Sequence, residues 1–241
     1  MKLPLSVLLF ATCLLAPAPA AAAGHAHTWA ASSGAYPDAD CFWHLITTNP
    51  ALATLGGGSL QIATGAPGDG HYYYEAGADL AIPDPWVIEA RVKVDTDNGT
   101  GQAATSAAIG FATAADVENI LFIGAGQIYL WSSYFVIGPQ ATLDTQSAFH
   151  TYRIEVTAAG AVSVFYDGTL TLSGVVYFDI TFEDSTYLWW GDGTSHASGT
   201  SHWEYLAHNG HAFDGCPTPV QPTTWGGIKG LYGAAAKASG R

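Results

Sequence analysis

The sequence predicts an all-β protein, built as a sandwich or a barrel of short antiparallel strands. Three observations lead to this fold class. Polar and apolar residues alternate with a period of two in many short runs, turn-forming Gly, Pro and Asp residues separate these runs, and no long helical period occurs before residue 220. This pattern is typical of antiparallel sandwiches and barrels.

The clearest strands lie within residues 149–173. Residues 151–157 and 162–166 have alternating side chains, and 169–173 form a third run. Asp167-Gly168 is a dipeptide typical of hairpin turns, because both residues tolerate positive φ. Three such strands form a meander, which buries one apolar face and therefore needs a second layer.

Further strands are expected on both sides of this meander. The best of them is 86–94, where Trp86 and Ile88 share an apolar face while Glu89, Arg91 and Lys93 share a polar, solvated face. Gly138-Pro139 is expected to end the strand at 134–137. Residues 29–36 are expected to be an opening strand or an extended arm. In chain order, the other expected strands are 42–45, 59–63, 71–75, 107–112, 119–124, 127–131, 175–180, 186–190 and 202–207.

The N-terminal residues have the pattern of a secretory signal peptide. Lys2 precedes an apolar run at 3–15, and small residues follow, so cleavage is expected after Ala23. A membrane anchor and a lipid-modified Cys13 are the alternatives. The run is short for a span of about 20 residues, and it continues past Cys13, which follows an unfavourable Thr12. We therefore expect a secreted, periplasmic or cell-surface protein with no membrane span after cleavage.

The remaining chain is divided into one domain at 24–216 and a tail at 217–241. Pro217 to Pro222 is typical of an extended linker. Beyond it, Trp225, Ile228, Leu231 and Tyr232 would share one face of a short helix, to which we assign no activity. Cys41 and Cys216 are most simply a disulfide in an exported protein, with two unpaired thiols as the alternative.

The charge argues against nucleic acid as a partner. The chain has 7 Lys and Arg residues against 20 Asp and Glu residues, and its net charge is −13. Phosphate backbones and anionic membrane surfaces repel such a protein.

Three stretches together resemble a known family. These are YRIEV…GAVSVFYDG…LTLSG at 152–174, WVIEARVKV at 86–94, and LWWGDGTS followed by WEYL at 188–206. They resemble strands of concanavalin A-like lectin/glucanase and laminin-G-like domains, over residues 28–215. The resemblance implies a two-sheet antiparallel jelly-roll sandwich. It leaves function open, because this fold carries lectins, hydrolases, lyases and adhesion modules.

The sequence favours binding over catalysis. Glycoside hydrolysis requires a pair of carboxylates. Hydrolases of this fold resemble one another in an E-x-D-x-(x)-E strand that places carboxylates on one face, and the chain lacks this strand. Glu183 and Asp184 are adjacent, so they would point to opposite faces of a strand. Arg153 and Glu155 resemble the arginine–glutamate strand of alginate lyases, but the accompanying Gln, His and Tyr motifs are missing.

Aromatic residues are the best candidates for a site, because sugar rings bind on aromatic faces while polar side chains bind their hydroxyls. For any single Trp, packing in the core is the more common role. We expect a polysaccharide or glycan partner, with a protein-binding adhesion module and a divergent hydrolase or lyase as alternatives. The candidate carbohydrate-binding residues are Trp43, Tyr73, Trp131, Trp189, Trp190 and Asp192.

The sequence shows no motif that requires a cofactor. Ca²⁺ is the one candidate ion for which it offers ligands. Asp192, or Asp38 with Asp40, would offer the oxygen ligands that calcium prefers. Asp-Gly turns are more often only turns. The histidines near the C-terminus do not follow a zinc-binding spacing.

Overall fold

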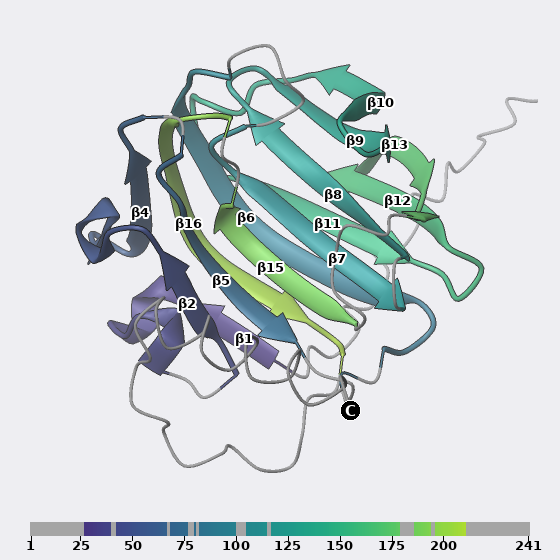
Figure 1. Ribbon diagram of the computed structural model, residues 1–241, viewed down its shortest axis with the longest axis horizontal. Helices are drawn as coiled ribbons and strands as arrows, with labels where there is room; N and C mark the ends of the chain where they lie inside the picture. The colour runs from purple at the N-terminus through teal and green to yellow at the C-terminus, as the bar shows by residue number, and fades with distance from the viewer. Residues whose placement is uncertain are drawn as a thin grey trace, which may run out of the picture.

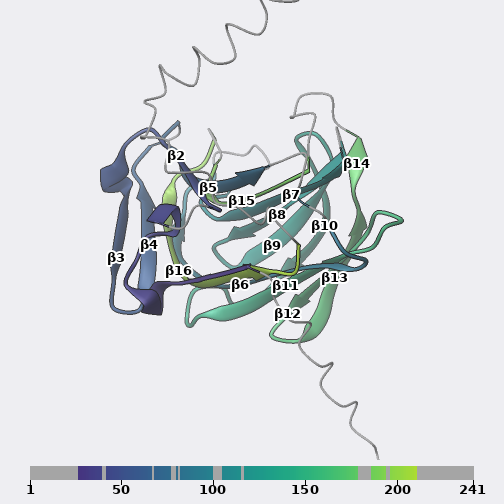
Figure 2. The same cartoon turned by 90° about the horizontal axis from the view of Figure 1, so that it is seen from below.

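The computed structural model describes residues 27–39, 42–66, 68–76, 80, 82–99, 105–114, 117–178, 186–193 and 196–210. These residues form two antiparallel sheets packed face to face (Figures 1 and 2). The predicted all-β, two-sheet sandwich is therefore confirmed.

Sheet A contains the predicted meander at one edge. Asp167 and Gly168 have φ values of 47° and 80°, as the hairpin turn requires. In spatial order, the sheet consists of β13 (Thr169–Val175), β12 (Ala161–Tyr166), β11 (His150–Val156), β6 (Trp86–Asp97), β16 (Gly199–His208), β4 (Ser59–Thr64) and β3 (Ala53–Gly56), with β1 (His27–Ala30) also paired to β16.

Sheet B supplies the second layer that the meander needs. Its spatial order is β10 (Val136–Thr142), β9 (Gln127–Ser133), β8 (Val117–Gly124), β7 (Ala108–Ala114), β15 (Tyr187–Asp192), β5 (His71–Ala76) and β2 (His44–Thr47), with β14 (Tyr177–Phe178) also paired to β8. Three short 3-10 helices complete the described elements: η1 (Ala31–Ser33), η2 (Pro37–Ala39) and η3 (Pro50–Leu52). None of these helices has the length and apolarity that a membrane span requires.

The core lies between the facing sides of the two sheets, and Trp190 is one of its central residues. Trp190 is fully buried. Its ring centroid lies 5.1 Å from that of Trp29, 4.9 Å from Tyr73 and 5.0 Å from Trp203. Because Trp29 and Trp203 belong to sheet A while Tyr73 belongs to sheet B, these contacts join the two layers.

The outer face of sheet A is polar and solvated, as the alternation in 86–94 predicts. Arg91 forms an ion pair with Glu204 at 2.7 Å, and Arg153 forms one with Glu155 at 2.6 Å. Such partly exposed pairs contribute little stability individually. This face, including the polar side of the meander, therefore forms part of the scaffold.

Three expected boundaries differ in the structure. The strand or extended arm expected at 29–36 is β1, which ends at Ala30 and is followed by η1. The sequence predicts a loop over 49–53, but η3 lies there, capped by Asn49 through a 3.0 Å bond from the Ala51 N–H, and β3 begins at Ala53. The strand expected at 134–137 is β10, which begins at Val136 and continues through Pro139. Proline is tolerated there because β10 is an edge strand.

Some predictions concern residues outside those that the structure describes. These are the signal peptide at 1–23, the tail at 217–241, Asp40, and the disulfide partners Cys41 and Cys216. They stay predictions. Of the strand expected at 175–180, β14 covers Tyr177–Phe178, and residues 179–180 are also outside the described set.

The buried His71 should make the free energy of unfolding depend on pH. Burial lowers the pKa of His71 from 6.5 to about 4. Below pH 6.5 the unfolded chain therefore takes up a proton that the folded chain does not, and stability should fall as the pH decreases from 6.5 to 4. From this shift the loss is about 3 kcal/mol at most. Urea unfolding across this range measures it.

The variant His71→Asn should flatten this part of the stability profile. His44→Asn is the matched control, since His44 is exposed on β2 and its replacement should leave the slope unchanged. An equal slope in the His71→Asn variant and the unsubstituted protein would contradict the assignment.

Candidate functional site

The outer face of sheet B is aromatic, in contrast to the polar outer face of sheet A. Along β15 and β8, both the inward and the outward side chains are buried. The outward side chains form a second buried cluster, separate from the core, which we call the outer aromatic cluster. It consists of Ala108, Ala112, Ile120, Phe122, Tyr129, Trp131, Tyr177, Tyr187 and Trp189, with Tyr72 and Tyr74 packed against it.

Trp189 lies flat on the sheet because β7 presents only small residues beneath it. Its backbone is paired with Gly110, and a Cβ built on Gly110 would overlap the indole ring. A Cβ on Gly193 would lie 2.8 Å from the same ring. Tyr72 contacts Trp189 edge-on at 5.7 Å. Two glycines and a tyrosine therefore fix the orientation of this indole.

Trp131 is positioned through its backbone by Asn119, which is fully buried. The Asn119 Nδ2 donates to the Trp131 carbonyl at 3.0 Å, and its Oδ1 accepts from the Trp131 N–H at 3.2 Å. The Trp131 ring contacts Phe122 at 5.0 Å and Phe135 at 5.3 Å. The Asn119 side chain on β8 thus bonds to the backbone of β9 in the place of backbone–backbone hydrogen bonds, and this positions Trp131.

A buried carboxylate lies on the same face, in the row of paired residues next to that of Trp189. Glu118 is 1% exposed and accepts hydrogen bonds from the hydroxyls of Tyr177, at 3.3 Å, and Tyr187. Tyr187 is paired with Ala112, Ala112 with Glu118, and Glu118 with Tyr177. These residues therefore form one row across β15, β7, β8 and β14.

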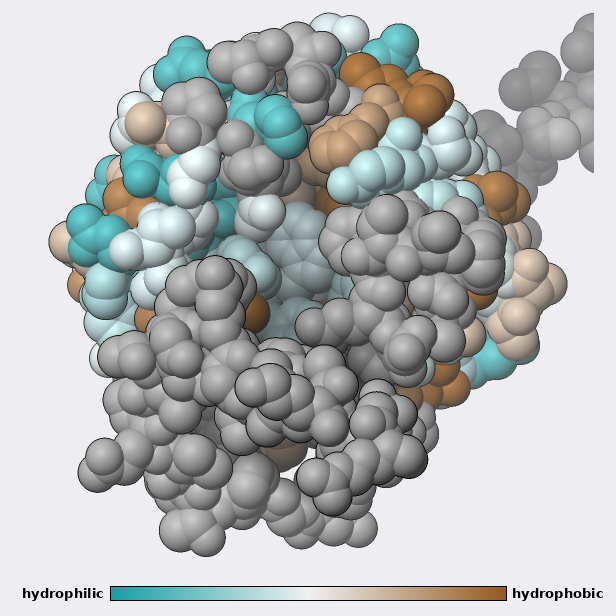
Figure 3. Space-filling view, in the orientation of Figure 1, coloured by the Kyte–Doolittle hydropathy of each residue, from teal (hydrophilic) through white to brown (hydrophobic). Residues whose placement is uncertain are grey.

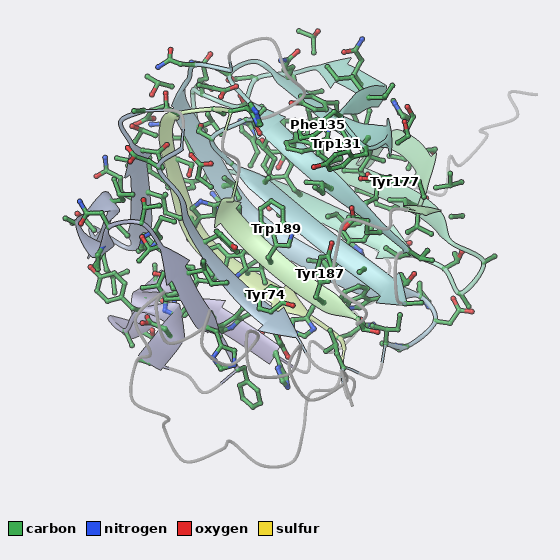
Figure 4. The ribbon with its side chains drawn as sticks, in the orientation of Figure 1. Tyr74, Trp131, Phe135, Tyr177, Tyr187 and Trp189 are labelled. Atoms are coloured by element: carbon green, nitrogen blue, oxygen red, sulfur yellow. The ribbon has the colours of Figure 1, made fainter. Side chains whose placement is uncertain are left out.

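Figure 4 shows the labelled aromatic side chains in two groups on this face. Trp131, Phe135 and Tyr177 lie on one side, and Tyr74, Tyr187 and Trp189 lie on the other. Because Tyr177 and Tyr187 both bond to Glu118, the carboxylate joins the two groups. The space-filling view shows that the middle of this face is recessed (Figure 3).

The rim beside Trp131 is apolar and exposed. Tyr134 and Phe135, in the turn between β9 and β10, are 42% and 40% exposed, and Val136 and Ile137 are 50% and 47% exposed. Apolar side chains gather over β10 in the space-filling view, at the upper right (Figure 3). Tyr134 contacts Trp131 at 5.8 Å, so this rim is continuous with the outer aromatic cluster.

Two tyrosine hydroxyls of this sheet, those of Tyr129 and Tyr73, remain protonated at neutral pH. Burial raises the pKa of Tyr129 in the outer aromatic cluster, and burial also raises the pKa of Tyr73 on the inner face. A protonated hydroxyl both donates and accepts hydrogen bonds. Tyr129 can therefore serve as a neutral polar group at the recessed face.

The structure separates the six predicted binding residues between the two faces of sheet B. Trp131 and Trp189 belong to the outer aromatic cluster. The other four side chains lie in or beside the core between the sheets and therefore not on the outer face: Trp43, which precedes β2, and Tyr73, Trp190 and Asp192. Asp192 accepts a 2.6 Å hydrogen bond from the Thr64 hydroxyl of sheet A, so it connects the sheets.

Several residues of the outer face were not among the predicted binding residues, including Tyr72, Tyr74, Glu118, Tyr177 and Tyr187. In the run Tyr72-Tyr73-Tyr74, the sequence indicates that the middle residue faces away from its neighbours. It does not indicate which of the two faces is the core. The direction is set by pairing with β15, where Tyr73 is opposite Trp190.

The predicted calcium ligands do not form a group among the described residues. Asp38 is exposed on η2, whereas Asp192 is buried between the sheets beside Thr64. Asp40 lies outside the described residues. Calcium binding at these positions stays a prediction.

No family model and no curated protein matches the chain, but solved structures do. An endo-1,3-beta-glucanase from Streptomyces sioyaensis is 15% identical, with a TM-score of 0.50, over 82% of this chain and 100% of that one. An alginate lyase from Pseudomonas aeruginosa is 11% identical, with a TM-score of 0.48, over 71% of this chain and 99% of the lyase chain. The metal-free carbohydrate recognition domain of Emp46p is 9% identical, with a TM-score of 0.40, over 69% of this chain and 87% of that domain's chain.

The likeness to the glucanase, together with the two packed antiparallel sheets, confirms the expected concanavalin A-like jelly-roll fold. At such identities the comparisons show the fold alone. The same sandwich carries unrelated activities, so function has to be argued from the side chains of the outer face.

The close approach of Trp189 to Gly110 can be tested by adding a methyl group. Gly110→Ala should displace the Trp189 ring and cost about 1–3 kcal/mol of stability through overpacking. Near-ultraviolet circular dichroism follows the ring, and urea unfolding measures the stability. The control is Gly56→Ala, because a Cβ on Gly56 would have nothing within 4 Å. Equal stability of the two variants would contradict the described packing.

Proposed function

We propose that this chain is a carbohydrate-recognition module that binds a polysaccharide or glycan, without cleaving it, on the outer face of sheet B. The observation that carries the proposal is the recessed aromatic face, with a buried carboxylate between two aromatic groups. With the export that the N-terminal sequence indicates, binding would take place outside the cytoplasm.

The chemistry of this face suits a sugar. The apolar C–H faces of a sugar ring pack on aromatic rings, and its hydroxyls require hydrogen-bond partners. Trp131 and Trp189 supply the rings, while Glu118 and the tyrosine hydroxyls supply acceptors and donors. Tyr134 and Phe135 extend the aromatic surface to the exposed rim.

Among the described residues, the outer face of sheet B carries one carboxylate, which favours binding over hydrolysis. Glycoside hydrolysis uses two carboxyl groups about 5–10 Å apart. Within the part of sheet B that the structure describes, Glu118 is the carboxylate of the outer face. Arg153 and Glu155, which resemble part of a lyase strand, lie on sheet A and pair with each other.

Two other functions are compatible with the fold. A module that binds protein would use the exposed apolar rim at β10, and a divergent hydrolase or lyase would require groups beyond those described. The glucanase from Streptomyces sioyaensis shares the fold and acts, by its name, on a carbohydrate. This supports a carbohydrate ligand without assigning the reaction.

Replacing the outward tryptophans tests the proposal. A glycan array, with and without calcium, first identifies a ligand, and calorimetry then measures its affinity. Trp189→Ala and Trp131→Ala should each weaken binding by about 1–2 kcal/mol, which is about 5- to 30-fold, because a ring that contacts sugar is lost. Phe165→Ala is the matched control, since Phe165 is paired with Arg153 on the outer face of sheet A.

The outcomes separate the three functions. Unchanged affinity in both tryptophan variants, with the fold intact by circular dichroism, would exclude this face as the sugar site. No glycan binding at all would favour the protein-binding module. Turnover of a bound polysaccharide, measured by release of reducing ends or unsaturated products and lost in Glu118→Gln, would show that the protein is an enzyme.

A further inference from the structure

A group of three potential metal ligands lies between the sheets. His27 belongs to β1 and His208 to β16, both in sheet A, while Glu75 belongs to β5 in sheet B. Their ligand atoms all lie within 4.8 Å of one another. We propose that these residues bind a divalent transition-metal ion and that the ion joins the two sheets. Zinc is the ion that best fits this set of ligands.

Two ligand distances, one to each oxygen of Glu75, are close to those around a tetrahedral ion. His27 Nδ1 lies 3.5 Å from Glu75 Oε1, and His208 Nε2 lies 3.0 Å from Glu75 Oε2. Zinc binds histidine nitrogen and carboxylate oxygen at about 2.0–2.2 Å, so adjacent ligand atoms around a tetrahedral ion are about 3.3 Å apart. Small side-chain movements would therefore bring all three residues to bonding distance of one ion.

The burial of the three side chains favours binding of an ion. The side chains of His208, Glu75 and His27 are 0%, 6% and 11% exposed. Among the described residues, Glu75 Oε1 is buried and makes no hydrogen bond, and its 3.5 Å contact with His27 Nδ1 is an ion pair only if that imidazole is protonated. Burying a carboxylate in this way is costly, and a bound dication would offset the cost.

The ligand types select the class of metal. Two imidazoles and one carboxylate suit zinc and its neighbours in the first transition series, whereas calcium takes oxygen ligands. The site is therefore chemically distinct from the calcium positions expected at Asp38, Asp40 and Asp192.

Neighbouring rings hold the two imidazoles in place. Phe42 contacts His27 at a centroid distance of 4.1 Å, and Trp43 contacts His208 edge-on at 6.0 Å. Such contacts restrict the orientation of metal ligands and exclude solvent. Trp43, expected from the sequence to bind sugar, instead contributes to this surrounding shell.

The site is independent of the proposed carbohydrate site, because Glu75 points from β5 to the inner side of sheet B while Tyr74 points to the outer side. A bound ion would connect β1, at the beginning of the described chain, with β5. Its expected effect is therefore on stability rather than on the outer face.

Zinc binding to the purified protein, after treatment with a chelator, tests the proposal. Zinc at about 100 times its Kd should raise the melting temperature by about 5–10 °C, and calorimetry should give one ion per chain. Glu75→Gln and His27→Ala should abolish both effects. Cobalt(II) should give the intense visible absorption of a four-coordinate site in the unsubstituted protein and not in Glu75→Gln.

Two controls separate this site from adventitious binding by histidine. His25→Ala tests the neighbouring N-terminal histidine, and His202→Ala tests a histidine of β16 that pairs instead with Asp95 at 2.9 Å. Both should keep the zinc effect. The proposal fails if zinc neither binds nor stabilises the protein, if Glu75→Gln binds zinc like the unsubstituted protein, or if His25→Ala alone removes binding.

Discussion

The position of Trp190 between the sheets determines the arrangement of the outer face of sheet B. Its contacts with Trp29, Tyr73 and Trp203 require it to point inward. Since side chains alternate along a strand, Tyr187 and Trp189 then point outward. A slip of one residue would move every side chain of β15 to the opposite face and expose the buried indole. The core therefore determines which aromatic residues of sheet B belong to its outer face.

The fold could be predicted from the sequence because its signals are local. The alternation in 86–94 and 151–157 depends only on nearby residues, as does the Asp167-Gly168 turn, and the structure confirms these elements. The resemblance to concanavalin A-like domains rested on the same strands. The end of β10 was predicted wrongly, because tolerance of Pro139 depends on an edge position that is set by the whole sheet.

The candidate site could be predicted only in part, because its composition depends on pairing between distant segments. Trp189 and Trp131 were named, but so were Trp190 and Tyr73, which belong to the core. Glu118 has no sequence signal of its own. Its role follows from the pairing of β8 with β7 and β14, which brings two tyrosines from later in the chain to its carboxylate. The approach of His27 to Glu75 and His208 likewise requires the completed sandwich.

Pro139 on the edge strand β10 has a consequence for the behaviour of the protein at high concentration. The exposed edge of a sheet can pair with another chain and begin aggregation, most readily where it is long and apolar. β10 carries exposed Val136 and Ile137, but Pro139 has no N–H to donate, and the register of the strand shifts between Ile137 and Gln140. A second molecule would therefore find an interrupted ladder at this edge. The apolar rim can remain open to a ligand without extending sheet B from one molecule into the next.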